Sequence, residues 1–168
     1  MILSQALEIA GRVKSELAPH CERIEIAGSI RRQKPDVGDI EIVCIPKPYE
    51  TGLFASGIAK VAGQWQKVKG EFPCLYTQRI LPHPDGDHFI KLDLFIATKD
   101  NWGLIFAIRT GSAEYSHRVL AAGWVRRGYW SVGGELHNHK GDICEIPEER
   151  DLFRLIGIPF CKPEDRNL

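Results

Sequence analysis

Three acidic side chains on two predicted strands have the types and spacing that could hold divalent metal ions. Residues two apart in a β-strand share a face, so Asp39 and Glu41 project together from the alternating segment 39–45. A second alternating segment, 88–97, carries Asp93 on its less apolar face. Carboxylate oxygens suit Mg²⁺ or Mn²⁺, and adjacent like charges are tolerated where a cation binds between them. Two such ions, about 3.5–4 Å apart, could activate an attacking hydroxyl and stabilise a pyrophosphate leaving group.

For any one of these acids alone, the simpler interpretation is the solvent-exposed face of an edge strand. The segment Gly28-Ser29, about ten residues before Asp39, favours a site instead. Glycine permits close approach of the backbone to a ligand, and the Ser29 hydroxyl could bind a phosphate.

The elements that must position these residues follow from periodicity and turn residues. Apolar residues at three- and four-residue steps predict an amphipathic helix over 4–17 with Ser4 as its N-cap. Alternation predicts four strands over 23–27, 39–45, 74–81 and 88–97. Helical spacing and caps predict three further helices over 52–62, 114–122 and 147–156. Segment 102–108 could be helix or strand, and short strands are plausible over 129–132 and 135–138.

Composition limits the class of protein. With 168 residues the chain fits one domain of ordinary size, or one domain with a small lobe. Its 22 basic and 22 acidic side chains give no net charge, so any nucleic-acid site must be a local patch. Five cysteines without a CxxC pair favour neither a zinc site nor a disulfide framework. No signal-like start and no run of 18 apolar residues occur, so we expect an intracellular protein: in the cytoplasm, in a host cell if viral, or in the nucleus.

Five segments, in order along the chain, resemble one family. Residues 28–32 (Gly-Ser-Ile-Arg-Arg) and 37–43 (Val-Gly-Asp-Ile-Glu-Ile-Val) resemble the Gly-Ser, Arg-Arg and Gly-Asp-x-Asp signature of family X DNA polymerases. Residues 91–95 are similar to the strand with the third catalytic aspartate, and 110–115 to the sugar and base pocket. Residues 148–166 resemble the end of the nucleotide-selecting subdomain called the thumb.

The resemblance implies an α+β fold: a nucleotidyltransferase-type mixed β-sheet palm with flanking helices over 1–100, then a small α/β thumb lobe over 101–168. It implies catalysis by Asp39, Glu41 and Asp93 with two Mg²⁺ or Mn²⁺ ions, Asp93 taking the ion that activates the primer 3′-hydroxyl. The implied nucleotide contacts are Gly28, Ser29, Arg32 and Gly38 at the triphosphate, Thr110 and Gly111 at the sugar, and Tyr115 beneath the base.

Local basic clusters suggest how nucleic acid would bind. We expect four side chains to contact the phosphate backbone of DNA: Arg31, Arg118, Arg126 and Arg127. The expected DNA has a primer 3′ end and is in particular gapped. The other expected partner is a nucleoside triphosphate, the protein is expected to be a monomer, and no membrane partner is expected.

The chain also departs from the family pattern. Glu41 stands where the polymerases usually have aspartate, although related small nucleotidyltransferases use an Asp-x-Glu pair. Ile108-Arg109 replaces an aromatic pair, which predicts weaker sugar selection. The chain begins where the family's palm begins, so the expectation is a minimal member of the kind that some viruses encode, without lyase activity.

Three functions are therefore compared. The first is a DNA-directed DNA polymerase that fills gaps in repair. The second is a nucleotidyltransferase acting on a small molecule, RNA or protein, which neutral charge and the Asp-x-Glu pair both suit. The third is a catalytically silent nucleic-acid-binding module, against which the three acids argue, since a binding module gains nothing from clustered carboxylates.

Overall fold

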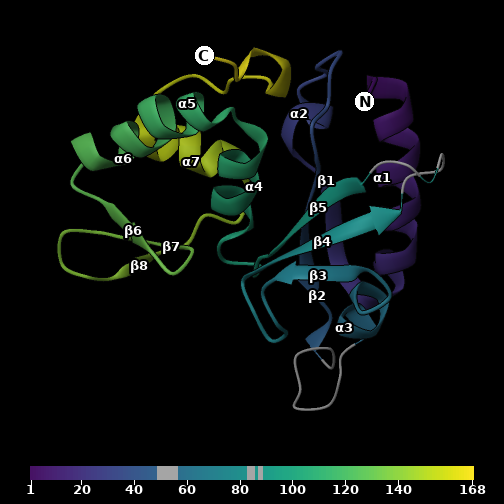
Figure 1. Ribbon diagram of the computed structural model, residues 1–168. Helices are drawn as coiled ribbons and strands as arrows, with labels where there is room; N and C mark the ends of the chain where they lie inside the picture. The colour runs from purple at the N-terminus through teal and green to yellow at the C-terminus, as the bar shows by residue number, and fades with distance from the viewer. Residues whose placement is uncertain (49–56, 83–85, 87–88) are drawn as a thin grey trace.

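The structure, a computed structural model, describes residues 1–48, 57–82, 86 and 89–168. Two groups of helices and strands lie side by side (Figure 1). We call residues 1–97 the N-terminal lobe and residues 102–168 the C-terminal lobe. The mixed composition of helices and sheet confirms the predicted α+β class, while the nucleotidyltransferase type of the fold stays a prediction.

A five-stranded mixed sheet forms the centre of the N-terminal lobe. Its order is β1-β2-β5-β4-β3, in which β2 and β5 are parallel and the other neighbours are antiparallel. The strands are β1 (Cys21–Ile26), β2 (Ile40–Pro46), β3 (Gln66–Lys69), β4 (Tyr76–Pro82) and β5 (Phe89–Ile96). The helical elements are α1 (Leu3–Leu17), the 3₁₀ turn η1 (Ala18–His20), α2 (Gly28–Arg31) and α3 (Gly57–Ala62).

Helix α1 packs on one face of this sheet and leaves the predicted acids on the other. Its buried side chains are those with helical spacing: Ala6, Ile9, Ala10, Val13 and Leu17. They share a core with alternate residues of the central strands, among them Ile40, Ile42, Leu92 and Leu94. Because alternate strand residues face opposite sides, Glu41 and Asp93 point away from α1. The predicted division of faces on β2 and β5 is therefore confirmed.

The C-terminal lobe is smaller and mainly helical. Its helical elements are α4 (Trp102–Thr110), α5 (Ala113–Tyr115), the π-helical segment η3 (Ser116–Ala121), α6 (Ala122–Arg126), α7 (Glu149–Ile156) and the 3₁₀ turn η4 (Pro163–Asp165). An antiparallel sheet contains β6 (Trp130–Val132), β7 (Glu135–His137) and β8 (Ile143–Cys144). A capping box between Glu148 and Asp151 starts α7, and Gly157, at φ 73°, ends it.

A third buried cluster joins the two lobes. Trp102 and Phe106 of α4 pack against Val43, Ile45 and Phe95 on the sheet face that α1 does not cover. Trp102 is fully buried there. Helix α4 thus belongs to both cores and holds the C-terminal lobe against the face that carries the acids. The boundary between subdomains at residue 100 stays a prediction.

The structure corrects several local predictions. The N-cap of α1 is Ile2, not Ser4, because the backbone of residues 1–3 pairs with residues 35–37 and sets where the helix begins. Segment 102–108 is helix. The helix predicted over 114–122 is divided by the π-helical segment η3. Strands β3 and β8 were not predicted, and part of the predicted helix over 52–62 lies outside the described residues.

The described residues contain no helix with the length and apolar composition needed to cross a membrane.

Candidate active site

The three predicted acids lie together on the face of the sheet that α1 leaves open. Glu41 on β2 and Asp93 on β5 are direct register partners in the parallel pair. Neighbouring strands are about 4.8 Å apart, so these two side chains start from adjacent positions. Asp39 occupies the bend just before β2, two residues ahead of Glu41. The structure therefore brings all three carboxylates to one end of the parallel strands.

Burial and mutual repulsion disfavour the charged forms of two of these acids. The pKa of Glu41 is raised from 4.5 to about 7, first by burial and then by the charges of Asp39 and Asp93. Arg32 and Arg109 partly oppose this rise. The pKa of Asp39 is raised by burial and by Asp93, with Lys91 opposing. A cation between these carboxylates would relieve the repulsion.

Whether the three acids can bind a metal ion depends on where their side-chain oxygens point. Among the described residues, no group of three or more His, Cys, Asp or Glu side chains is arranged to hold a metal ion. The Glu41 carboxylate lies against Gly28, and Asp93 Oδ1 faces two donors on β4. The donor set is nevertheless all oxygen, and nearby cations offset its negative charge only in part. Oxygen donors of this kind are the ligands that Mg²⁺ or Mn²⁺ prefers. Asp39, Glu41 and Asp93 are the residues that would hold such ions.

Gly28 stands directly beside Glu41, and Ser29 follows it in the chain. The Ala27 N–H donates to the Glu41 carbonyl (2.8 Å), which brings the start of α2 alongside β2. Gly28 has φ +60°, and a side chain there would collide with the Glu41 carboxylate. The buried Ser29 Oγ has no hydrogen-bond partner in the described part of the chain. A buried unpaired hydroxyl costs about 1–3 kcal/mol, and a hydrogen bond from Ser29 to a ligand oxygen would remove that cost.

Arg32 lies close to the acids and is already partly engaged. Burial lowers its pKa, and the charges of Glu41 and Asp39 oppose that shift. Its Nη1 donates to the Thr110 carbonyl (2.7 Å), and its Nε donates to Asn167 Oδ1 (3.0 Å). Gly38, directly before Asp39, has open space around it. The predicted triphosphate residues are thus grouped around the acids.

Arg31 has a different environment from its neighbour. Its guanidinium donates to both carboxylate oxygens of Glu149 (2.8 and 2.7 Å) and to Thr110 Oγ1 (2.6 Å). Glu149 also accepts from the fully buried Arg166 (2.5 Å). Arg31 therefore links the two lobes, and its expected contact with DNA stays a prediction.

The predicted sugar and base residues lie mostly in the interior. Thr110 is fully buried; its hydroxyl accepts from Arg31, the last residue of α2, and its carbonyl accepts from Arg32, which follows α2. Gly111 caps the end of α4. Tyr115 is 5% exposed and belongs to the core of the C-terminal lobe. Its role beneath a base stays a prediction, since its ring is packed rather than open.

The remaining predicted DNA contacts are not gathered at the acids. Arg118 is exposed and pairs with Glu114 (3.0 Å). Arg126 and Arg127 are exposed at the end of α6. Helix α6 itself lies on the side of the C-terminal lobe away from the five-stranded sheet (Figure 1). Arg127 lies against Gly157.

Three residues near the acids were not predicted from the sequence. Tyr76 Oη and Gln78 Nε2 each donate to Asp93 Oδ1 at 2.8 Å. The Arg109 guanidinium lies 4.1 Å from the centre of the Phe95 ring and influences Glu41. Tyr76 and Gln78 are two apart in the strand predicted over 74–81, so the sequence indicates that they share a face. Only the register of β4 on β5 shows that both reach Asp93.

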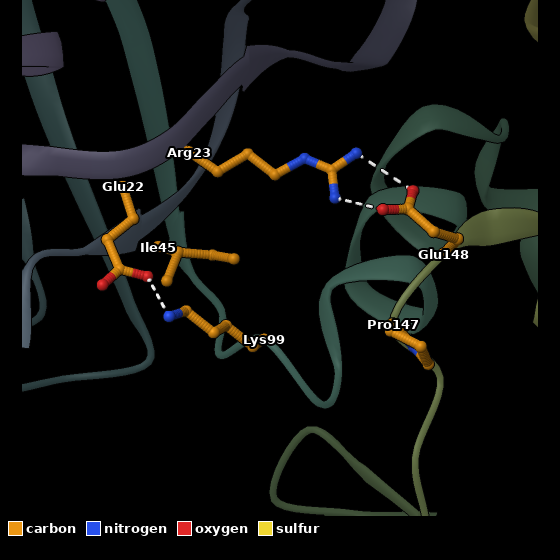
Figure 2. A pocket seen from close by; sticks show the side chains of 6 residues that line it. All are labelled: Glu22, Arg23, Ile45, Lys99, Pro147 and Glu148. Carbon is orange, nitrogen blue, oxygen red and sulfur yellow. Dashed lines mark hydrogen bonds and ion pairs between the residues drawn. The ribbon is translucent and has the colours of Figure 1, made fainter.

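A separate cavity of about 310 Å³ lies elsewhere between the lobes. Figure 2 shows its lining, in which Lys99 pairs with Glu22 (2.9 Å) and Arg23 pairs with Glu148 (2.6 Å). Ile45 also lines it, about 13 Å along β2 from Glu41 at 3.3 Å per residue. Because its charges are already paired and it is remote from the acids, it is not the candidate active site.

Comparison of the sequence with protein-family models and with curated proteins finds no match to this chain.

Proposed function

We propose that this protein is a nucleotidyltransferase that adds deoxynucleotides to a primer 3′ end, in the manner of a family X DNA polymerase filling gaps. The observation that carries the proposal is the pairing of Glu41 with Asp93 on adjacent parallel strands, with Asp39 two residues upstream. Crowded carboxylates are destabilising while they are charged, in keeping with the raised pKa of Glu41, and a bound cation would relieve their repulsion. The sequence resemblance supplies the reaction class.

Each group of residues has a task in this proposal. Asp39, Glu41 and Asp93 would hold two Mg²⁺ or Mn²⁺ ions. Bound metal would supply activation of the 3′-hydroxyl and neutralise charge on the leaving pyrophosphate. The Arg32 guanidinium would bind the triphosphate because it interacts with the charges of Glu41 and Asp39. The hydroxyl of Ser29, which follows Gly28 and lacks a partner among the described residues, would bind a phosphate oxygen.

A nucleotidyltransferase acting on a smaller substrate is the second candidate, and a specific observation favours it. Of the four arginines expected to contact DNA, Arg31 is occupied by Glu149 and Arg118 pairs with Glu114. Fewer positive charges then remain for a DNA backbone on a chain with no net charge.

Single-turnover primer extension separates these functions. Purified protein is given gapped, recessed and single-stranded DNA with each deoxynucleotide and Mg²⁺, and DNA affinity is measured in parallel. The polymerase proposal expects extension of gapped or recessed DNA and its loss in Asp93→Ala. Unchanged extension by Asp93→Ala would refute the assignment of the acids.

Two other outcomes point to the alternatives. Wild type that binds DNA without extending it would favour the silent binding module. Hydrolysis or transfer of nucleotide without DNA binding, abolished by Asp93→Ala, would favour the smaller substrate.

A further inference from the structure

Two donors on the neighbouring strand contact the same oxygen of Asp93. Tyr76 Oη donates to Asp93 Oδ1 at 2.8 Å, and Gln78 Nε2 donates to the same atom at 2.8 Å. Gln78 is the register partner of Asp93 in the antiparallel β4–β5 pair, and Tyr76 is the partner of Phe95. Both donors therefore reach Asp93 from the same face of the sheet.

This arrangement makes the two carboxylate oxygens of Asp93 unequal. A carboxylate oxygen offers about two lone-pair positions, and at Oδ1 the two donors take both. Oδ2 receives no hydrogen bond from the described residues. It is the oxygen left for a cation or an attacking hydroxyl.

The donors are themselves held in place. The Tyr76 ring stacks on Phe95 with centroids 4.9 Å apart, and Lys69 Nζ lies 5.1 Å from the centre of the Tyr76 ring. Gln78 is half-buried within the central part of the sheet. Rigid donors of this kind hold an acceptor in one rotamer.

We infer that Tyr76 and Gln78 are positioning residues that bind Asp93 Oδ1 and so direct Oδ2 toward the reacting hydroxyl. This inference rests on the proposed function. In this proposal Tyr76 and Gln78 act through their hydrogen bonds to Asp93 rather than on substrate or metal. Their loss allows Asp93 to turn about its side-chain bonds, which misplaces Oδ2 without removing it.

The test uses single-turnover primer extension by Tyr76→Phe, Gln78→Met and the double variant. A misplacement of about 1 Å in a reacting group can cost about a hundredfold in rate, so we expect losses of about tenfold for each single variant and more for the double. Affinities for DNA and for nucleotide should stay within about twofold of wild type. Tyr129→Phe in the C-terminal lobe and Gln66→Met on exposed β3 are the matched controls and should extend at the wild-type rate.

A double-mutant cycle distinguishes positioning from a structural role. In an Asp93→Glu background the longer side chain no longer fits the two donors, so Tyr76→Phe should change the residual rate less than about twofold. An equal loss in both backgrounds would overturn the inference, as would wild-type extension by the double variant.

A readout without catalysis keeps the inference testable if no nucleotide transfer is found. The side-chain amide signals of Gln78, assigned by their absence in Gln78→Met, should shift in the nuclear magnetic resonance spectrum of Asp93→Ala. Mn²⁺ binding, followed by its paramagnetic signal, should weaken several-fold in the double variant. Unmoved Gln78 signals together with unchanged Mn²⁺ affinity would overturn the inference, whereas failure of wild type to extend primers would count only against the polymerase proposal.

Discussion

Replacing Glu149 by glutamine should show how much the buried ion pairs of Glu149, one of which joins the two lobes, contribute to the stability of the protein. Glu149 on α7 accepts from Arg31 of α2 through both oxygens, across 118 residues of sequence, and from Arg166 near the C-terminus. The side chains are 9%, 21% and 0% exposed, respectively. Glu149→Gln leaves two largely buried guanidinium groups without a counter-charge.

The expected decrease in the free energy of unfolding of Glu149→Gln is large for a single substitution. Removing one partner of a buried ion pair costs about 3–5 kcal/mol. Each kcal/mol lowers the melting temperature of a chain of this size by about 2–4 °C, which predicts a drop of about 6–20 °C. Glutamine keeps one acceptor oxygen, so the lower half of that range is expected.

The neighbouring glutamate provides a matched control. Glu148 also accepts two hydrogen bonds from an arginine of the N-terminal lobe, Arg23, at 2.6 and 3.0 Å. Those side chains are 57% and 38% exposed, and exposed pairs contribute about 0–1 kcal/mol. The Glu148 side chain also accepts from the Asp151 N–H in the capping box of α7, and glutamine keeps an acceptor for that bond. Glu148→Gln should therefore lower the melting temperature by no more than about 4 °C.

The difference in melting temperature between wild type and Glu149→Gln should depend on pH if it is electrostatic in origin. Burial alone would raise the pKa of Glu149, but the hydrogen bonds and charges of Arg31 and Arg166 outweigh it and lower the pKa below 4.5. A carboxyl group with a lowered folded-state pKa contributes stability above its unfolded pKa and loses it as the pH falls through the folded value. Thermal melts should thus show the gap between wild type and Glu149→Gln narrowing below pH 4.5. Equal effects of Glu149→Gln and Glu148→Gln, or a gap independent of pH, would refute the reasoning.

Three further predictions concern the candidate site and its partners. Gly28→Ala should abolish extension and lower the melting temperature more than Gly133→Ala, because both glycines have φ near +60° but only Gly28 adjoins Glu41; equal effects would leave backbone strain alone as the cause. DNA affinity should fall steeply as the salt concentration rises, since each neutralised phosphate releases about 0.9 counterion, and Arg126→Ala should make this salt dependence less steep. A DNA affinity that does not change with salt contradicts the expected contacts with phosphates. Rejection of ribonucleotides should be weaker than in larger family X polymerases, because Ile108-Arg109 stands where the pattern that this chain resembles has an aromatic pair. Incorporation of each ribonucleotide is compared with that of its deoxy counterpart, and strong rejection of ribonucleotides contradicts the prediction.

Much of the fold could be predicted because its signals are local. The alternation over 39–45 and 88–97 gives β2 and β5 within one or two residues, and helical spacing gives α1. Strand β3 was not predicted because all four of its residues are exposed, and it therefore has no alternation of apolar and polar residues. The π-helical segment inside 114–122 depends on packing in the C-terminal lobe, which no local pattern reports.

In the candidate site, too, the features set by local spacing could be predicted from the sequence, and those set by contacts between distant residues could not. Spacing alone puts Asp39 and Glu41 on one face, but the pairing of Glu41 with Asp93 depends on a parallel register across about 50 residues of sequence. Arg31 and Arg32 are equivalent in sequence, and only the fold gives one of them a buried partner on α7. A basic cluster therefore cannot be assigned to a polyanion from sequence alone.

The stability of Asp93 variants brings these points together, because the structure changes what the sequence predicts. From charge alone, Asp93→Ala should be no less stable without metal, since it removes one member of a repulsive cluster. The structure adds that Asp93 accepts hydrogen bonds from Tyr76 and Gln78, and an unpaired buried donor costs about 1–3 kcal/mol. Asp93→Asn removes the charge and keeps an acceptor oxygen for both donors, so metal-free Asp93→Asn should melt at or above the wild-type temperature and Asp93→Ala below it. If both variants melt above wild type, repulsion outweighs the hydrogen bonds; if both melt below it, the carboxylates do not repel one another enough to require a cation.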